Sequence, residues 1–160
     1  RTRGQRLRVG HVVYPGDRWR FVFTATGNVP LDNRFFRDAP GRAVVVAPES
    51  MDATRAQEIE RSATLLRAGL RAVDVRAALA TIRRRYGVEH LLLEGGSELN
   101  WAFLEANAVD ELFLTVAPKI KGGSGLPTVV GGQGLPGHDC LPLSLVSVYR
   151  EGDELYLRYR

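Results

Sequence analysis

The sequence predicts an α/β domain with three layers, α/β/α, around a mixed, mostly parallel central sheet that ends in an antiparallel hairpin. Three observations predict this fold class. Apolar runs of strand length alternate with stretches of helical periodicity through the middle of the chain. Glycine, proline, asparagine and aspartate separate most of these segments. The last two apolar runs flank a turn at residues 151–153, which favours antiparallel pairing. We expect one domain over residues 1–160.

The first part of the chain predicts three strands and a helix. Residues 20–24 form a β-rich apolar run that ends in small, turn-forming residues, and a second run covers residues 42–47. A helical pattern follows between residues 50 and 61, where Ser50 or Asp52 is available as the N-cap. Ile59 is expected on the inner face of this helix, and a short strand is expected near residues 65–66.

The middle of the chain predicts an amphipathic helix over residues 74–86. Val75, Leu79 and Ile82 recur at helical spacing, and Gly87 stands where a helix commonly ends in a left-handed residue. We expect this helix to cover one face of the sheet.

The second half of the chain predicts one more buried strand, a helix and the closing strands. Residues 90–93 form a continuous apolar run, typical of a strand buried on both faces. The further elements expected are a helix carrying Leu99, Phe103 and Leu104, a strand at residues 112–120, a glycine-rich segment at 122–137, and hairpin strands at 143–150 and 155–160.

Composition indicates a soluble globular protein. The chain has 160 residues, of which 44% are hydrophobic and 25% charged, so it can bury a core without metal or disulfides. No apolar stretch approaches the roughly 18 residues that cross a bilayer, and no secretory signal is evident. Cys140 is the only cysteine, which fits a reducing cytoplasm. We expect a cytoplasmic protein without membrane contact.

Positive charge comes almost wholly from arginine, and the net charge is +4. The one arginine run, residues 83–85, lies late in a predicted helix, where positive charge suits the helix dipole. No aromatic and basic platform accompanies it. We interpret the run as a solvated helix face and expect no nucleic-acid partner.

The most informative segment joins the predicted strand at residues 90–93 to the next helix through Gly95 and Gly96. Glycine lets the backbone approach a ligand closely, and the unpaired amides at a helix start attract anions, so a pyrophosphate is the natural occupant. Ser97 is expected to cap the helix, with Glu98 in its first turn. The alternative is a tight turn that needs small residues, because the segment matches neither G-x-G-x-x-G nor a P-loop.

Glu94 stands at the carboxyl end of the predicted buried strand. An unpaired carboxylate there costs several kcal/mol to desolvate. Either a structural ion pair to an arginine or a substrate contact would offset this cost, and the ends of sheet strands are where open α/β sheets hold ligands.

Three motifs carry a resemblance to a known family. Residues 92–100 read LLEGGSELN, residues 109–112 read VDEL, and residues 117–123 read APKIKGG. In this order and spacing they resemble the reductase domain of the riboflavin-biosynthesis deaminase-reductases and their single-domain relatives. Residues 21–30 and the C-terminal hairpin also look like the family pattern.

The resemblance implies a dihydrofolate-reductase-like fold and an oxidoreductase that uses NADPH. In the family a hydride passes to the anomeric carbon of a ring-opened ribosylamine, so that the ribosyl group of a phosphorylated pyrimidine becomes ribityl. The protein then mainly orients two bound molecules and excludes water. A homodimer is also implied.

The resemblance assigns site residues by position. Glu94 matches the substrate-contacting glutamate of the family. The cofactor-phosphate turn is matched by Gly96, Ser97, Glu98, Leu99 and Asn100, with Gly95 giving the backbone its freedom.

Residues 24–26 match a segment near the adenosine end of the cofactor, where the hydroxyls of Thr24 and Thr26 would reach the 2′-phosphate that separates NADPH from NADH. The acid–serine pair of the family reads Thr24-Ala25 here, which bears on the cofactor preference. A threonine-rich turn without a ligand is the alternative.

The N-terminal part departs from the family pattern. The family begins with a strand, a Ser-Leu-Asp-Gly-like segment and a helix, which we expect to lie outside this numbering. Arg6 and Arg8 fall near the arginines that bind the substrate phosphate in the family. No catalytic acid can be assigned.

Other functions remain as alternatives. The same turn suits a reductase of a pterin or dihydrofolate-like substrate, or a non-catalytic nucleotide-binding dimeric protein. A metal site is not expected, because the three histidines His11, His90 and His138 show no ligand spacing with Cys140. Ser97 is not in a G-x-S-x-G elbow, which argues against a serine hydrolase.

Overall fold

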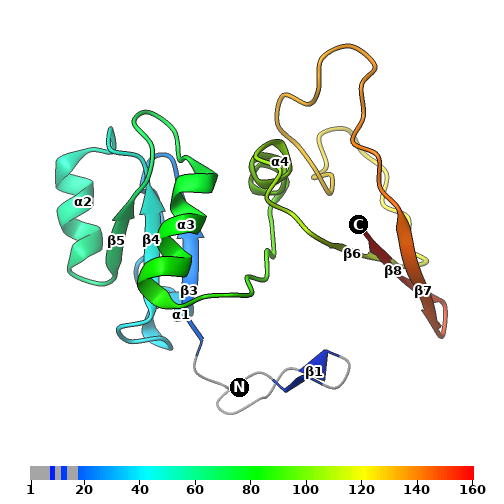
Figure 1. The fold of residues 1–160 in the computed structure, drawn as a ribbon, viewed down its shortest axis with the longest axis horizontal. Coiled ribbons are helices and arrows are strands. Elements are labelled where there is room, and N and C mark those ends of the chain that lie inside the picture. Colours follow the sequence, from blue (N-terminus) through cyan, green and yellow to red (C-terminus); the bar gives the residue numbers. More distant parts are fainter. Residues whose placement is uncertain (1–7, 10–11, 14–17) are drawn as a thin grey trace. The chain divides into compact units, whose positions relative to one another are not determined.

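The computed structural model describes residues 8–9, 12–13 and 18–160, and it divides the chain into two compact units (Figure 1). The first unit ends at His90, and the second runs from Leu91 to Arg160. Near the start, β1 (Arg8–Val9) pairs with β2 (Val12–Val13) in antiparallel fashion. Arg6 and His11 lie outside the described residues.

The first unit is built on a parallel three-stranded sheet. Its strands are β3 (Arg20–Phe23), β4 (Ala43–Ala47) and β5 (Thr64–Arg67), in the order β3-β4-β5. All three strands were expected, and the observed ends differ from the predicted ends by at most one residue. All five residues of β4 are buried, as expected of the central strand in a sheet covered on both faces.

Helices α2 (Ala53–Glu60) and α3 (Val75–Tyr86) confirm the two helices predicted from the apolar periodicity. Asp52, rather than Ser50, caps α2, because its carboxylate accepts a hydrogen bond from the Arg55 amide at 2.9 Å. Asp74 caps α3, and Gly87 ends it with a φ of 65°. A single further turn, α1 (Arg34–Arg37), is not predicted by the sequence pattern.

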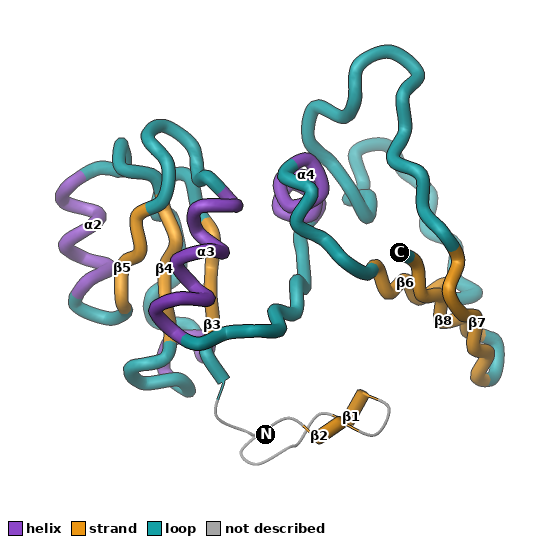
Figure 2. Tube along the Cα trace, viewed as in Figure 1, coloured by secondary structure: helices purple, strands orange, loops and turns teal. Residues whose placement is uncertain are grey.

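Two apolar clusters give the first unit its three layers (Figure 2). Side chains alternate along β4, so that Val45 packs with Ile59 of α2 on one face. Val44 and Val46 pack with Ile82 of α3 on the other face. The α/β/α arrangement therefore follows from one strand that is apolar at every position.

The second unit contains one helix and an antiparallel sheet. The helix α4 spans Ser97–Glu105, and the strands are β6 (Leu112–Val116), β7 (Leu145–Glu151) and β8 (Glu154–Tyr159). The sheet order is β6-β8-β7, which confirms the predicted C-terminal hairpin. β6 is shorter than expected because its partner β8 begins at Glu154, and because Pro118 lacks an amide hydrogen.

The strand predicted at residues 90–93 is wrong. No strand is assigned there, and Leu91 and Leu92 are 39% and 65% exposed. A strand needs a neighbour for its backbone hydrogen bonds, and no strand of the described residues pairs with this segment. The predicted combination of parallel and antiparallel pairing is nevertheless confirmed, in two separate sheets. Among the described residues no helix combines the length and apolar character needed to span a membrane.

Candidate functional site

The turn before α4 is built from Gly95 and Gly96. Gly95 has a φ of 79°, in the region that favours glycine, and the peptide bond between the two glycines is cis. Gly96 is the N-cap of α4, and within the described part of the chain no side chain forms a cap hydrogen bond there. The prediction that Ser97 caps the helix is therefore wrong, because the cap torsions fall on Gly96 and Ser97 is already helical.

Backbone amides at the start of α4 lack acceptors within the helix. The first internal bond runs from the Asn100 amide to the Gly96 carbonyl at 2.9 Å, so the amides before Asn100 have no intrahelical acceptor. A Cβ built on Gly96 would meet no described atom within 4 Å beyond its sequence neighbours. The turn is open on the side of Gly96, and Glu98 lies in the first turn as expected.

A segment of the glycine-rich region, residues 128–132, lies against the first turn of α4. The Gly131 amide donates to the Ser97 carbonyl at 3.0 Å, and the Gly132 amide donates to Glu98 Oε1 at 3.0 Å. Asn100 Nδ2 donates to the Val129 carbonyl at 2.7 Å. The side chains of Glu98 and Asn100 therefore hold a neighbouring loop, a role that the sequence did not predict.

Two glycines allow these close approaches. A Cβ on Gly132 would lie 2.2 Å from Trp101 Cδ1, and a Cβ on Gly95 would lie 3.0 Å from the Asn100 amide group. The pairing of residues about thirty positions apart leaves no local sequence signal except the glycine pair Gly131-Gly132.

Glu94 is exposed and follows an irregular segment rather than a buried strand. The Glu94 carboxylate therefore needs no partner to offset burial, contrary to the expectation from the sequence. An exposed carboxylate next to the glycine turn is still accessible to a ligand.

An apolar hollow of about 270 Å³ also lies in the second unit, lined by Trp101, Leu104, Leu112, Val130, Leu135, Asp139, Cys140, Leu141 and Leu143. Its lining contains no positively charged side chain, so it does not suit a phosphate. Among the described residues no group of three or more His, Cys, Asp or Glu side chains could hold a metal ion.

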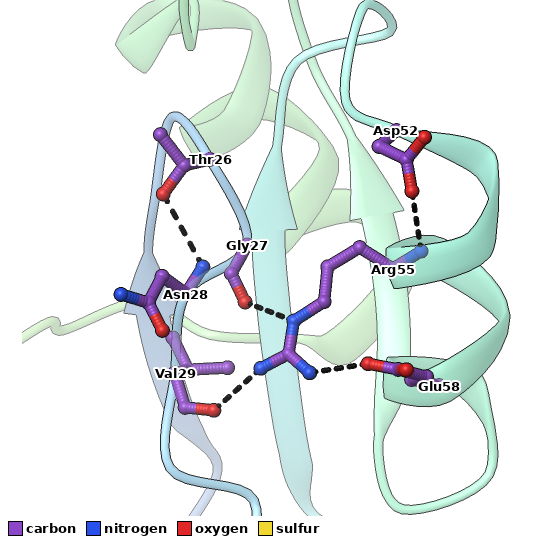
Figure 3. Close-up of polar contacts among 7 residues, drawn as sticks. All are labelled: Thr26, Gly27, Asn28, Val29, Asp52, Arg55 and Glu58. Carbon is purple, nitrogen blue, oxygen red and sulfur yellow. Dashed lines mark hydrogen bonds and ion pairs between the residues drawn. The ribbon is translucent and has the colours of Figure 1, made fainter.

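In the first unit, the loop after β3 carries both predicted threonines. We call residues 24–29 the Thr24 loop (Figure 3). Thr24 Oγ1 accepts a hydrogen bond from the Gly27 amide at 3.0 Å, and Thr26 Oγ1 accepts one from the Asn28 amide at 3.3 Å. These bonds use oxygen lone pairs, so each hydroxyl keeps its hydrogen for an acceptor.

Arg55 of α2 reaches the same loop. Its Nε donates to the Gly27 carbonyl at 2.8 Å, and its Nη2 donates to the Val29 carbonyl at 2.8 Å (Figure 3). Its Nη1 forms an ion pair with Glu58. Arg55 is not predicted from the sequence, because a contact across 26 to 28 residues leaves no local pattern.

The Asp-Glu-Leu motif has a structural role in the second unit. Glu111 accepts hydrogen bonds from Arg158 of β8 and from Arg160, which follows the strand, and these bonds hold the pKa of the Glu111 carboxyl below its ordinary value, with Arg158 the main cause. The cluster links the start of β6 to the end of β8.

Comparison with known proteins identifies the family of the chain. The model of the RibD C-terminal domain family matches residues 8–157. The chain is 35% identical over 148 residues to the 2,5-diamino-6-ribosylamino-4(3H)-pyrimidinone 5′-phosphate reductase of Methanothermobacter thermautotrophicus, covering 91% of this chain and 67% of the relative. The reductase of the same name from Aquifex aeolicus is 33% identical over 138 residues, covering 85% and 61%.

A third relative is the riboflavin biosynthesis protein RibD of Actinobacillus pleuropneumoniae, which is 29% identical over 144 residues. This match covers 88% of the chain but 38% of the relative. The chain thus spans about two thirds of the two reductases and much less of RibD.

Solved structures share the fold. RibD of Acinetobacter baumannii superposes with a TM-score of 0.69 at 22% identity, covering 88% of this chain and 36% of that chain. A pyrimidine reductase-like protein from Corynebacterium diphtheriae gives a TM-score of 0.71 at 18% identity, covering 88% and 59%. These likenesses confirm the predicted dihydrofolate-reductase-like fold class, and the match over residues 8–157 shows that the chain belongs to the RibD C-terminal domain family.

Proposed function

We propose that this chain is an NADPH-dependent reductase that converts a phosphorylated ribosylamino-pyrimidine to its ribitylamino form in riboflavin biosynthesis. The observation that carries the proposal is the open glycine turn at the start of α4, where backbone amides have no intrahelical acceptor. The family membership and the names of the two reductases support the same activity.

The turn fits a dinucleotide diphosphate. Amides at a helix start, with the positive end of the helix dipole behind them, form a site for an anion, and Gly96 leaves room for it. We propose that the cofactor is bound by Gly95, Gly96, Ser97, Glu98, Leu99 and Asn100. In this set Glu98 and Asn100 contribute by holding residues 128–132 against the helix.

The preference for NADPH over NADH is assigned to the Thr24 loop. The hydroxyl hydrogens of Thr24 and Thr26 suit the oxygens of a 2′-phosphate, because the hydroxyl oxygens already accept bonds from the backbone. Thr26 is exposed, so its hydroxyl is accessible to a ligand.

The chemistry needs little from the protein beyond placement. When bound, NADPH supplies the hydride that the reduction requires. Glu94 is proposed to accept hydrogen bonds from the substrate, and Arg6 and Arg8 are proposed to bind its phosphate. The chain contributes by orienting the two molecules and excluding water. We further propose that residues 1–160 act as one reductase domain, in a cytoplasmic homodimer.

The test is the oxidation of NADPH by the 160-residue chain with candidate substrates. Stoichiometric oxidation with the ribosylamino-pyrimidine phosphate, and none with dihydrofolate, is the expected result. The reverse pattern would assign the chain to pterin or dihydrofolate reduction. Binding of NADPH without turnover of either substrate would indicate a non-catalytic nucleotide-binding protein.

A further inference from the structure

We propose that Arg55 is a positioning residue for the cofactor: it holds the Thr24 loop in the shape that presents the threonine hydroxyls to the 2′-phosphate. The proposal rests on the function proposed above. Arg55 acts through the loop and does not itself need to touch the ligand.

The guanidinium of Arg55 is bound on three sides. Two of its nitrogens donate to the carbonyls of Gly27 and Val29, each at 2.8 Å, and the third nitrogen pairs with Glu58 (Figure 3). The planar guanidinium presents its donors in a fixed fork, so bonds to two carbonyls set both the distance and the orientation of the loop. The side chain is only 27% exposed, which favours a fixed conformation.

Packing at Gly27 reinforces the same contact. Gly27 is buried with a φ of 76°, and a Cβ there would lie 2.6 Å from Met51 Sδ and 2.9 Å from Arg55 Cγ. The loop therefore rests directly on α2, with the stem of Arg55 beneath it and the guanidinium beside it.

The loop backbone that Arg55 holds is also the backbone that orients the threonine hydroxyls. Thr24 Oγ1 accepts from the Gly27 amide, and Thr26 Oγ1 accepts from the Asn28 amide. Both amides belong to the loop segment whose carbonyls, at Gly27 and Val29, are bonded to Arg55. If the carbonyls of Gly27 and Val29 lost their bonds to Arg55, these amides could move. The threonine hydroxyls would then no longer be held in one orientation.

Charge also favours a positioning role. The ion pair with Glu58 offsets the positive charge of Arg55, so the guanidinium is not an isolated cation awaiting a phosphate. A residue that bound the phosphate directly would be expected to face the ligand with its charge uncompensated.

The experiment compares Arg55→Met with Arg61→Met in the full chain. Arg55→Met keeps an unbranched apolar stem but removes every donor, whereas Arg61 is an exposed residue at the C-cap of the same helix. For Arg55→Met we expect the KM for NADPH to rise about tenfold, the effect of losing one to two hydrogen bonds. The kcat at saturating NADPH should stay within about twofold, because the hydride-transfer step is not touched.

Three further readouts separate positioning from general stability. The preference for NADPH over NADH should fall in Arg55→Met and stay unchanged in Arg61→Met. Arg55→Lys, which retains one charged donor, should recover part of the NADPH affinity. Hydrogen exchange at the amides of Gly27 and Asn28 should quicken in Arg55→Met, because the turn that protects them is released.

A double-mutant cycle with Thr26→Val tests the route of the effect. If Arg55 acts through the loop, the two losses in NADPH affinity are not additive. An additive pair, or an unchanged KM for NADPH in an active Arg55→Met protein, would overturn the positioning role while the reductase function stands. Failure of the wild-type chain to bind NADPH would overturn both proposals.

Discussion

The glycine turn predicts an unusual separation of stability from cofactor binding in Gly96→Val. Gly96 has φ and ψ of −59° and 175°, an extended conformation open to any residue, and its Cβ would point into open space. A substitution of glycine at a compatible position changes the free energy of unfolding by about 1 kcal/mol or less, commonly in the stabilising direction. The variant should therefore fold.

Cofactor affinity should respond much more strongly. The valine side chain would occupy the space in which we place the diphosphate, and it would keep the phosphate away from the amides. A hydrogen bond to a charged group contributes about 1.5–3 kcal/mol, so loss of two such bonds costs about 3 kcal/mol or more. The dissociation constant for NADPH should rise at least about a hundredfold.

The assay is a titration with NADPH followed by tryptophan fluorescence, together with urea unfolding. Trp101 lies on α4 close to the turn and reports on it. Gly122→Val is the matched control, because Gly122 is a described glycine whose φ lies outside the positive range and whose Cβ would also meet open space. We expect the control to keep both stability and NADPH affinity. A folded Gly96→Val protein that binds NADPH like the wild type would refute the reasoning.

Three other predictions follow from the packing and charges. Ile59→Ala empties a fully buried position between α2 and the sheet, and urea unfolding should show a loss of about 2–5 kcal/mol; a loss well under 1 kcal/mol would contradict the packing. Gly132→Ala would place a methyl group against Trp101, so tryptophan fluorescence should change and NADPH binding weaken; an unchanged spectrum would count against the contact. Glu111→Gln removes a carboxyl whose pKa is lowered in the folded state, mainly by Arg158. Its stabilisation is present above the ordinary carboxyl pKa and disappears as pH falls through the lowered one, so the stability difference from the wild type should shrink in acid; a difference independent of pH would contradict this assignment.

The first unit could be predicted because its signals are local. The valine run of β4, the cap Asp52 and the left-handed Gly87 each act within a few residues in the sequence. The alternation of side chains along one buried strand then forces helices onto both faces of the sheet.

The failures concern interactions between distant residues. An apolar run at residues 90–93 has the composition of a buried strand, but strand formation depends on a partner that the segment itself does not specify. Ser97 has the chemistry of a cap, yet the cap position falls one residue earlier, on Gly96. Helix boundaries are commonly displaced by a residue or two in this way.

The local structure of the candidate site was predicted in outline and missed in detail. The glycine turn and its open amides follow from the pattern of residues 94–99. Glycine favours a turn, and the first amides of any helix lack partners within the helix. The loop that Glu98 and Asn100 hold, and the arginine that holds the Thr24 loop, depend on contacts across about thirty residues. Local sequence patterns do not predict contacts of this kind.

The most direct measurement is an NMR titration of the chain with NADPH, in which the backbone amide signals of Gly96, Ser97 and Glu98 are followed. We predict that these signals shift together and saturate at the same NADPH concentration as the tryptophan fluorescence. If NADPH binds and these three amides do not respond, the turn before α4 is not the diphosphate site and the account is wrong.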